Sequence, residues 1–288
     1  MSDLRHSRNM PRFAPTTNPR IFMNKRSLLH SAIALLLGTA LAAPTLAQDK
    51  KTIKVGVTAG PHAQIMDQVR RVAAKDGLAI QVIEFSDYVQ PNAALAAGDL
   101  DANSYQHGPY LDAQVKDRGY PLVTAFNTVN FPIGLYSKKV RTLDALQPGA
   151  RFGIPNDPTN GGRVLLLLQE KGLIKLKPGA GLKATPLDVV ANPKKLKLVE
   201  LDAAQLARSL DDLDASAINT NFAISAGLNP KTDSIAQEDP KGPYVNLMVV
   251  READKNQPWV ASLRKAYQSQ EIRQFIETEF KGSVLPAF

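Results

Sequence analysis

Short apolar runs and longer amphipathic stretches alternate along the chain from residue 53 to its end. The runs have the length of buried strands, and the stretches place apolar residues three or four positions apart, as on one face of a helix. Glycine or proline marks most of the boundaries between them. The pattern predicts strands at 53–57, 79–85, 102–105, 131–136, 151–154 and 244–250. It predicts helices at 61–76, 91–97, 109–118, 161–171, 258–267 and 271–281, with a helical turn at 142–146.

This alternation is typical of an α/β fold in which helices cover both faces of a parallel sheet. The roughly 240 residues after residue 47 supply enough core for one large domain or two medium ones. We therefore expect two α/β lobes rather than one.

The first 47 residues have the organisation of a signal peptide. Lys25 and Arg26 precede an apolar run at 32–37, and a zone of small residues follows it up to Ala47. A basic start, a short apolar centre and a small-residue end are the three parts of an export signal. The apolar run is too short to span a bilayer. We expect cleavage after Ala47, with Ala42 as the alternative, and therefore a periplasmic protein.

Removing this leader changes the charge of the chain. The whole chain has 35 basic and 27 acidic residues, whereas the part after residue 47 has 29 and 26, a net charge of +3. The high isoelectric point therefore comes largely from the leader, and no nucleic-acid partner is expected.

The chain contains no cysteine. Disulfides, thiolate metal sites and cysteine nucleophiles are therefore excluded. Attachment of a lipid to an N-terminal cysteine is excluded as well, so we expect a soluble, freely diffusing periplasmic protein. No cofactor and no metal site are predicted.

The stretch from Pro155 to Arg163 reads as a strand end, a turn and the start of a buried helix. A cation in the first turn lies at the positive end of the helix dipole, where it loses roughly 0.3–1 kcal/mol. Gly161 and Gly162 leave nearby amide groups accessible. Bare amides, a helix N-terminus and a guanidinium that can grip a carboxylate with two parallel bonds together predict an anion site. A pair between Arg163 and Asp157, or another acid of the chain, is the open alternative.

Other polar and aromatic side chains stand where predicted strands end, and ligands bind at such ends in open α/β sheets. Taken singly, the histidines are more often structural, the asparagines satisfied by backbone and the tyrosines part of the core. Their coincidence at strand ends favours one shared site. These residues are Tyr88, Tyr105, His107, Tyr110, Asn219, Asn221 and Asn246.

Several motifs resemble those of one family, the methionine-binding proteins of ABC importers, also known as the NlpA lipoprotein family. They extend over about 53–282, and the string at 154–169 is the most specific. The motifs are Gly60-Pro-His-Ala63, the stretch 84–89, Asp101-Ala-Asn103, Gln106-His107, Pro109-Tyr-Leu111, the stretch 155–168, Ala203-Ala-Gln-Leu206, the stretch 208–212 and Pro243-Tyr-Val-Asn246.

The resemblance implies a two-lobed fold of the type II periplasmic-binding-protein kind, closing on one amino acid between the lobes. The lobes are expected at 48–128 plus 245–288 and at 129–244, with a hinge near 128–131 and 242–244. In this family arrangement Arg163 would hold the ligand carboxylate, and Asn219 and Asn246 would engage the head group. The side chain would be enclosed by Tyr88, Tyr105, His107 and Tyr110.

The implied function is capture of methionine and its delivery to the membrane subunits of an ABC importer by a monomeric, non-enzymatic protein. Tyr105 stands where the family pattern has phenylalanine, and its hydroxyl could shift preference toward a more polar ligand. The same module could therefore bind another small amino acid or a methionine-containing dipeptide. A more remote alternative is an exported hydrolase or isomerase that uses His107 with Asp101 or Glu84, although no nucleophile elbow accompanies them.

Overall fold

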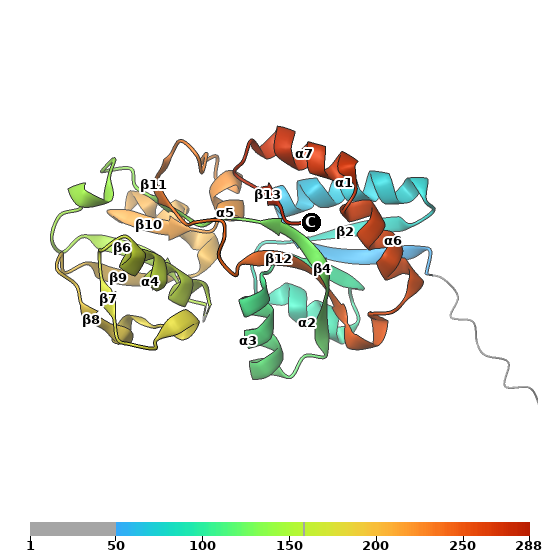
Figure 1. The fold of residues 1–288 in the computed structure, drawn as a ribbon, viewed down its shortest axis with the longest axis horizontal. Helices are drawn as coiled ribbons and strands as arrows, with labels where there is room; N and C mark the ends of the chain where they lie inside the picture. Colours follow the sequence, from blue (N-terminus) through green and yellow to red (C-terminus); the bar gives the residue numbers. More distant parts are fainter. Residues whose placement is uncertain (1–49, 158) are drawn as a thin grey trace, which may run out of the picture. The chain divides into compact units, whose positions relative to one another are not determined.

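The computed structural model describes residues 50–157 and 159–288, and the expected leader lies outside them. The described chain folds around two principal sheets (Figure 1). Each sheet has its own hydrophobic core. Within these residues, no helix is both long and apolar enough to cross a membrane.

The first sheet has six strands in the order β13-β4-β12-β3-β1-β2. Helices α1, α6 and α7 share a core with one of its faces, and α2 and α3 share a core with the other. Strand β12 shows how one strand serves both cores, because Met248 and Val250 enter one of them and Leu247 and Val249 the other. Its elements are β1 (Thr52–Thr58), α1 (Pro61–Lys75), β2 (Ala79–Phe85), α2 (Gln90–Ala97), β3 (Ala102–Ser104), α3 (Gly108–Arg118), β4 (Leu122–Asn130), β12 (Val245–Arg251), η6 (Glu252–Asp254), α6 (Pro258–Tyr267), α7 (Gln270–Phe280) and β13 (Leu285–Pro286).

The second sheet has five strands in the order β11-β5-β10-β6-β9. Its larger core receives the leucines of α4, and a smaller core forms around Tyr136, Leu206 and Ile218. Its elements are β5 (Gly134–Tyr136), η1 (Leu143–Ala145), β6 (Arg151–Pro155), α4 (Asn160–Glu170), the pair β7 (Lys175–Leu176) and β8 (Val189–Ala191), η2 (Gly181–Lys183), η3 (Pro186–Asp188), β9 (Lys197–Leu201), η4 (Ala203–Gln205), η5 (Arg208–Asp211), β10 (Ala215–Ile218), α5 (Thr220–Ser225) and β11 (Ser234–Gln237).

The sheets are mixed, and the expectation of parallel sheets is wrong in this respect. Strand β1 is parallel to β2 and β3, but β12 is antiparallel to both β3 and β4. The chain leaves the first sheet at the end of β4 and returns to it at the start of β12. An outgoing and a returning strand that lie side by side run in opposite directions, so this excursion dictates the antiparallel pair.

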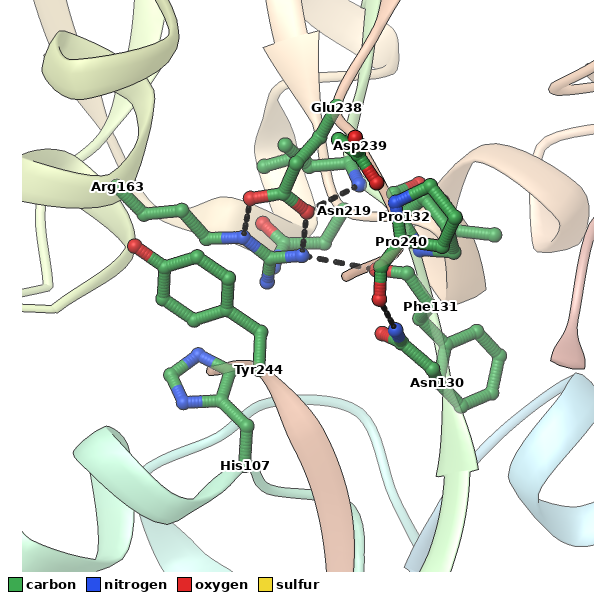
Figure 2. A network of polar contacts seen from close by, with 12 residues as sticks. His107, Asn130, Phe131, Pro132, Arg163, Asn219, Glu238, Asp239, Pro240 and Tyr244 are labelled. Carbon is green, nitrogen blue, oxygen red and sulfur yellow. Dashed lines mark hydrogen bonds and ion pairs between the residues drawn. The ribbon is translucent and has the colours of Figure 1, made fainter. Parts of the chain in front are cut away.

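Two stretches connect the sheets, and we call residues 131–133 and 238–244 the crossing segments. The first follows β4 and the second precedes β12. They are bonded to each other, since the Glu238 amide donates to the Ile133 carbonyl at 3.0 Å. The Asn130 side chain also donates to the Pro240 carbonyl (Figure 2). Whether the lobes divide at the boundaries expected from the sequence stays a prediction.

Candidate functional site

A small cavity lies where the ends of strands from both sheets come together. It contains about 350 Å³ of empty space, including its opening to solvent. Only a small molecule can be enclosed in it. Arg163 and the seven residues expected in a shared site at strand ends all line this cavity. The lining residues are His62, Tyr88, Tyr105, Gln106, His107, Tyr110, Phe131, Asn160, Arg163, Asn219, Thr220, Asn221 and Asn246.

Arg163 is almost fully buried and is bonded along one edge of its guanidinium. Its Nε donates to Glu238 Oε1 at 2.8 Å, and its Nη2 donates to Glu238 Oε2 and to the Phe131 carbonyl (Figure 2). The Tyr244 ring stacks against the guanidinium, with its centre 4.1 Å from Cζ. Among the described residues, the one hydrogen-bond acceptor near Nη1 is Asn160 Oδ1, at 3.5 Å, which is longer than an ordinary hydrogen bond. Nη1 is therefore the part of the guanidinium that remains available to a ligand.

These contacts bear on the two hypotheses for Arg163, a site for an external anion or a pair with an acid of the chain. It is paired with an acid of the chain, but the acid is Glu238 rather than Asp157. The edge made of Nε and Nη2 could have held a ligand carboxylate with two parallel bonds, and Glu238 occupies it. A ligand carboxylate can meet Nη1 without displacing this pair.

The N-terminus of α4 is not the open receptor that the glycines suggested. The Asp157 carboxylate accepts hydrogen bonds from the backbone amides of Thr159 and Asn160 at 3.2 and 2.9 Å. The glycines instead permit close packing, because a Cβ on Gly162 would lie 2.3 Å from the Leu182 carbonyl oxygen. The helix starts at Asn160 and its N-cap residue, Thr159, makes no side-chain cap. Asp157 supplies that cap from two residues earlier.

Asn160 brings three elements together at the cavity. Its Oδ1 accepts a hydrogen bond from Asn219 Nδ2 at 3.0 Å and lies 3.2 Å from His107 Nε2. Its Nδ2 is held by the Asp157 carboxylate at 3.0–3.1 Å, which fixes the orientation of the amide. Asn219 Oδ1 then has no hydrogen-bond partner among the described residues. Asn219 Oδ1 can therefore accept a hydrogen bond from a ligand in the cavity.

The Asn246 side-chain amide has the opposite orientation to that of Asn219, because its oxygen rather than its nitrogen is engaged by the protein. Its Oδ1 lies 3.2 Å from His62 Nε2, and His62 Nδ1 lies 2.9 Å from the Thr58 hydroxyl. A proton on His62 Nε2 satisfies both contacts, because Thr58 then donates to Nδ1 and Asn246 accepts from Nε2. Within the part of the chain that the structure describes, the Asn246 Nδ2 has a single long contact of 3.4 Å, to the Tyr244 carbonyl. Asn246 therefore offers the cavity a donor.

Both histidines of the cavity are neutral at neutral pH. Burial lowers the pKa of His62 to about 4, against a smaller opposing contribution from Asn246. Burial, with the nearby Arg163 charge, lowers the pKa of His107 to about 3. His107 is occupied by Asn160 and by the Tyr110 amide, while Asp101 is bonded to Lys50 and to the Lys54 amide. No contact between His107 and Asp101 therefore supports the hydrolase alternative among the described residues.

Three tyrosines form a wall at the other end of the cavity. Tyr88, Tyr105 and Tyr110 have ring centres 5.9–6.2 Å apart. Tyr88 donates to Asn221 Oδ1 at 2.6 Å, and Tyr110 donates to the Tyr88 carbonyl at 2.9 Å. Burial raises the pKa of Tyr105 well above its ordinary value. Among the described residues, neither the Tyr105 hydroxyl nor Asn221 Nδ2 has a hydrogen-bond partner.

Comparisons with known proteins decide the family. The model of the NlpA lipoprotein family matches residues 53–288. The chain belongs to this family. A nutrient-binding protein from Burkholderia cenocepacia, solved bound to methionine, is 57% identical with a TM-score of 0.81 and covers 82% of this chain and 100% of its own.

Two further relatives have a similar level of sequence identity to this chain. The D-methionine-binding lipoprotein MetQ of Escherichia coli is 50% identical over 261 residues, covering 88% of this chain and 96% of its own. An ABC transporter periplasmic substrate-binding protein from Coxiella burnetii is 48% identical with a TM-score of 0.79, covering 82% of this chain and 100% of its own. The expected α/β fold of two-lobed periplasmic binding proteins is confirmed, and these relatives are named as binding proteins rather than enzymes.

The expectation of a freely diffusing periplasmic protein is wrong. The family is described as a lipoprotein family, and the E. coli relative is named a lipoprotein. The expectation rested on the absence of cysteine from the sequence. A missing attachment residue does not establish that a protein is soluble.

Sequence reasoning left several lining residues out of the site. His62 and Asn160 were not among the expected site residues, and Asn221 was expected in the site without a role of its own. The signal for Asn160 was its place three residues before Arg163, one turn away on the same helix face. Phe131, Gln106 and Thr220 carry no such signal.

Proposed function

We propose that the protein captures free methionine between its two lobes and delivers it to the membrane subunits of an ABC importer. The cavity supports this because a fixed guanidinium nitrogen faces one end and three tyrosines line the other. The methionine in the B. cenocepacia relative and the name of the E. coli relative support it from outside the chain.

The head group of an amino acid fits the donors and acceptors at the Arg163 end. Arg163 Nη1 and Asn246 Nδ2 would donate to the carboxylate, and Asn219 Oδ1 would accept from the ammonium group. Hydrogen bonds to charged groups contribute about 1.5–3 kcal/mol each. These three residues therefore act as the selector for a free amino acid.

The methionine side chain fits the wall. Tyr88, Tyr105, Tyr110 and His107 would enclose it, and contacts between sulfur and aromatic rings contribute about 0.3–1.5 kcal/mol each. The crossing segments would act as the hinge of closure, with residues 48–128 and 245–288 in one lobe and 129–244 in the other.

Calorimetric titration of ligand-free protein with L- and D-methionine tests the proposal. We expect saturable binding of at least one enantiomer. Arg163→Lys should weaken it at least about tenfold, because an ammonium cannot hold Glu238 and the ligand in fixed geometry. Arg208→Lys, the same change at an exposed position, is the matched control. Absence of binding by either enantiomer would refute the proposal.

A second candidate ligand is an amino acid whose side chain ends in a hydrogen-bond acceptor. The unpartnered Tyr105 hydroxyl and Asn221 Nδ2 favour it, because a buried donor without a partner costs about 1–3 kcal/mol. A competition panel that includes glutamine, methionine sulfoxide and methionine-containing dipeptides separates the two candidates. The second requires a rival that binds at least about tenfold more tightly than methionine.

A further inference from the structure

Glu238 holds Arg163 from the side that faces away from the cavity. Its two carboxylate oxygens take Nε and Nη2, and Oε2 also accepts from the Ile133 amide at 3.2 Å. The Arg163 side chain is 3% exposed and that of Glu238 is 11% exposed. Glu238 belongs to one crossing segment, and Phe131 belongs to the other (Figure 2). Ile133 belongs to the same segment as Phe131.

This pairing sets the charge of the cavity. Within the described part of the chain, Arg163 is the one lining residue that carries a charge at neutral pH, since both lining histidines are neutral there. Glu238 does not line the cavity but lies directly behind the guanidinium. Asp157 lies at the N-terminus of α4, where it accepts from the backbone amide of Asn160 and the helix dipole offsets part of its charge. At the Arg163 end of the cavity, guanidinium and carboxylate together leave no net charge.

A neutral cavity and a positive one select different ligands. A buried positive charge without a partner attracts any anion of suitable shape. A guanidinium whose charge is already balanced gains less from a net negative ligand, and still donates to a carboxylate through Nη1. A zwitterion brings an ammonium group as well, which can donate to Asn219 Oδ1. Balance by Glu238 therefore favours the zwitterion over the anion.

We infer that Glu238 is a positioning residue that determines specificity: it fixes Nη1 of Arg163 toward the cavity and balances its charge, so that a zwitterionic amino acid is selected over an anion with the same carboxylate and side chain. The inference rests on the proposed function, because it takes methionine as the zwitterion.

The experiment compares two probes of nearly identical shape. Methionine is the zwitterion, and 2-hydroxy-4-(methylthio)butanoate, in which a hydroxyl replaces the ammonium group, is the anion. Calorimetry at low ionic strength gives both dissociation constants for the wild type, Glu238→Gln, Glu238→Asp and Glu170→Gln. Glu170 lies on the same helix as Arg163 but is exposed and paired with Lys171, so its variant is the matched control.

The wild type should bind methionine at least about tenfold more tightly than the hydroxy acid. Glu238→Gln should shift this ratio at least about tenfold toward the hydroxy acid, because the balancing charge is gone. Glu238→Asp keeps the charge and should weaken both ligands while leaving the ratio within about threefold of the wild type. Glu170→Gln should change neither affinity.

An unchanged ratio in Glu238→Gln, with both ligands weakened by the same factor, would show that Glu238 is only structural. Should that variant fail to fold, equal affinity of the wild type for both probes would overturn the inference on its own. A wild type that binds no methionine would refute the proposed function, which is a different result from an unchanged ratio.

Discussion

Arg163 carries a positive charge in an almost fully buried position, and Glu238 compensates it through two hydrogen bonds. Removing one member of such a pair leaves the other charge buried and uncompensated, which costs about 3–5 kcal/mol. Replacing both members by apolar side chains of similar volume is often close to neutral. Arg163 therefore contributes to the stability of the ligand-free protein, in addition to its proposed role of binding the ligand carboxylate.

Arg163→Met should lower the free energy of unfolding of the ligand-free protein by about 3–5 kcal/mol, because Glu238 loses its partner. The double variant Arg163→Met, Glu238→Met should recover most of this loss but no methionine binding. Urea denaturation and calorimetry measure the two effects separately. Lys138→Met, which breaks the exposed pair with Asp211, is the control and should change stability little. A single variant as stable as the wild type would contradict the prediction.

His62 gives a second prediction for single residues, on pH. Its pKa is lowered from 6.5 to about 4 by burial, so below pH 6.5 the unfolded chain binds a proton that the folded protein does not. The stability from His62 is therefore present above pH 6.5 and is lost as pH falls toward 4, by about 1.4 kcal/mol per pH unit. His62→Gln should reduce the slope of unfolding free energy against pH between 6 and 4.5, while the slope above pH 7.5 stays as in the wild type. An equal slope in both proteins would show that His62 does not titrate in this way.

At the scale of elements, helix α4 positions Arg163 through its contact with the η2 turn. A Cβ on Gly162 would lie 2.3 Å from the Leu182 carbonyl oxygen and 2.9 Å from its carbonyl carbon. Both obstacles are backbone atoms, so the turn or the helix would have to move. The close approach of these two elements fixes where the first turn of α4, and with it Arg163, lies.

Gly162→Ala should therefore destabilise the protein by about 1–3 kcal/mol, as overpacking of a well-packed site does, and should weaken methionine binding by displacing Arg163. Urea denaturation and calorimetry check the two effects. Gly108→Ala is the matched control, because a Cβ there would meet no atom within 4 Å and the backbone needs no positive φ. Equal stability of the two variants would rule out the packing argument.

The elements that carry a strong local pattern could be predicted from the sequence. Helix α6 and strand β2 have the expected bounds, because glycine, proline or a change of hydrophobic period marks their ends. Strand β4 was missed because Asn127 and Thr128 interrupt its apolar residues. Strand β9 was missed as well, because it is at a sheet edge and only half-buried.

The site residues at strand ends could be predicted because the ends of neighbouring strands converge whatever the details of packing. The partner of Arg163 could not, since Glu238 is 75 positions away in the sequence and belongs to a crossing segment without a periodic pattern. For the same reason the orientations of the Asn219 and Asn246 amides, which depend on Asn160 and His62, had no signal in the sequence.

At the scale of the whole described protein, hydrogen bonds join residues of the two sheet units across the cavity. Tyr88, which follows β2 of the first sheet, donates to Asn221 of α5 at 2.6 Å. Tyr110 of α3 makes a bond of similar length to the Tyr88 carbonyl, but both partners belong to the first sheet unit. One hydroxyl therefore ties the two units together and the other does not, although both tyrosines belong to the same wall.

Closure of the two lobes on a ligand is expected to depend on the Tyr88 bond and not on the Tyr110 bond. Tyr88→Phe leaves Asn221 Oδ1 without its donor only in the closed form, because water can satisfy this oxygen when the lobes separate. A net hydrogen bond contributes about 0.5–1.5 kcal/mol, so the ratio of closed to open form should fall about twofold to twelvefold. Methionine should dissociate faster by that factor. Stopped-flow displacement measures the dissociation rate, with the association rate expected to stay within about twofold.

Tyr110→Phe is the control. It removes a hydroxyl from the same wall but leaves the bond between the sheet units intact, and should change the dissociation rate less. Equal acceleration in both variants would mean that the wall, rather than the bond across the cavity, controls release.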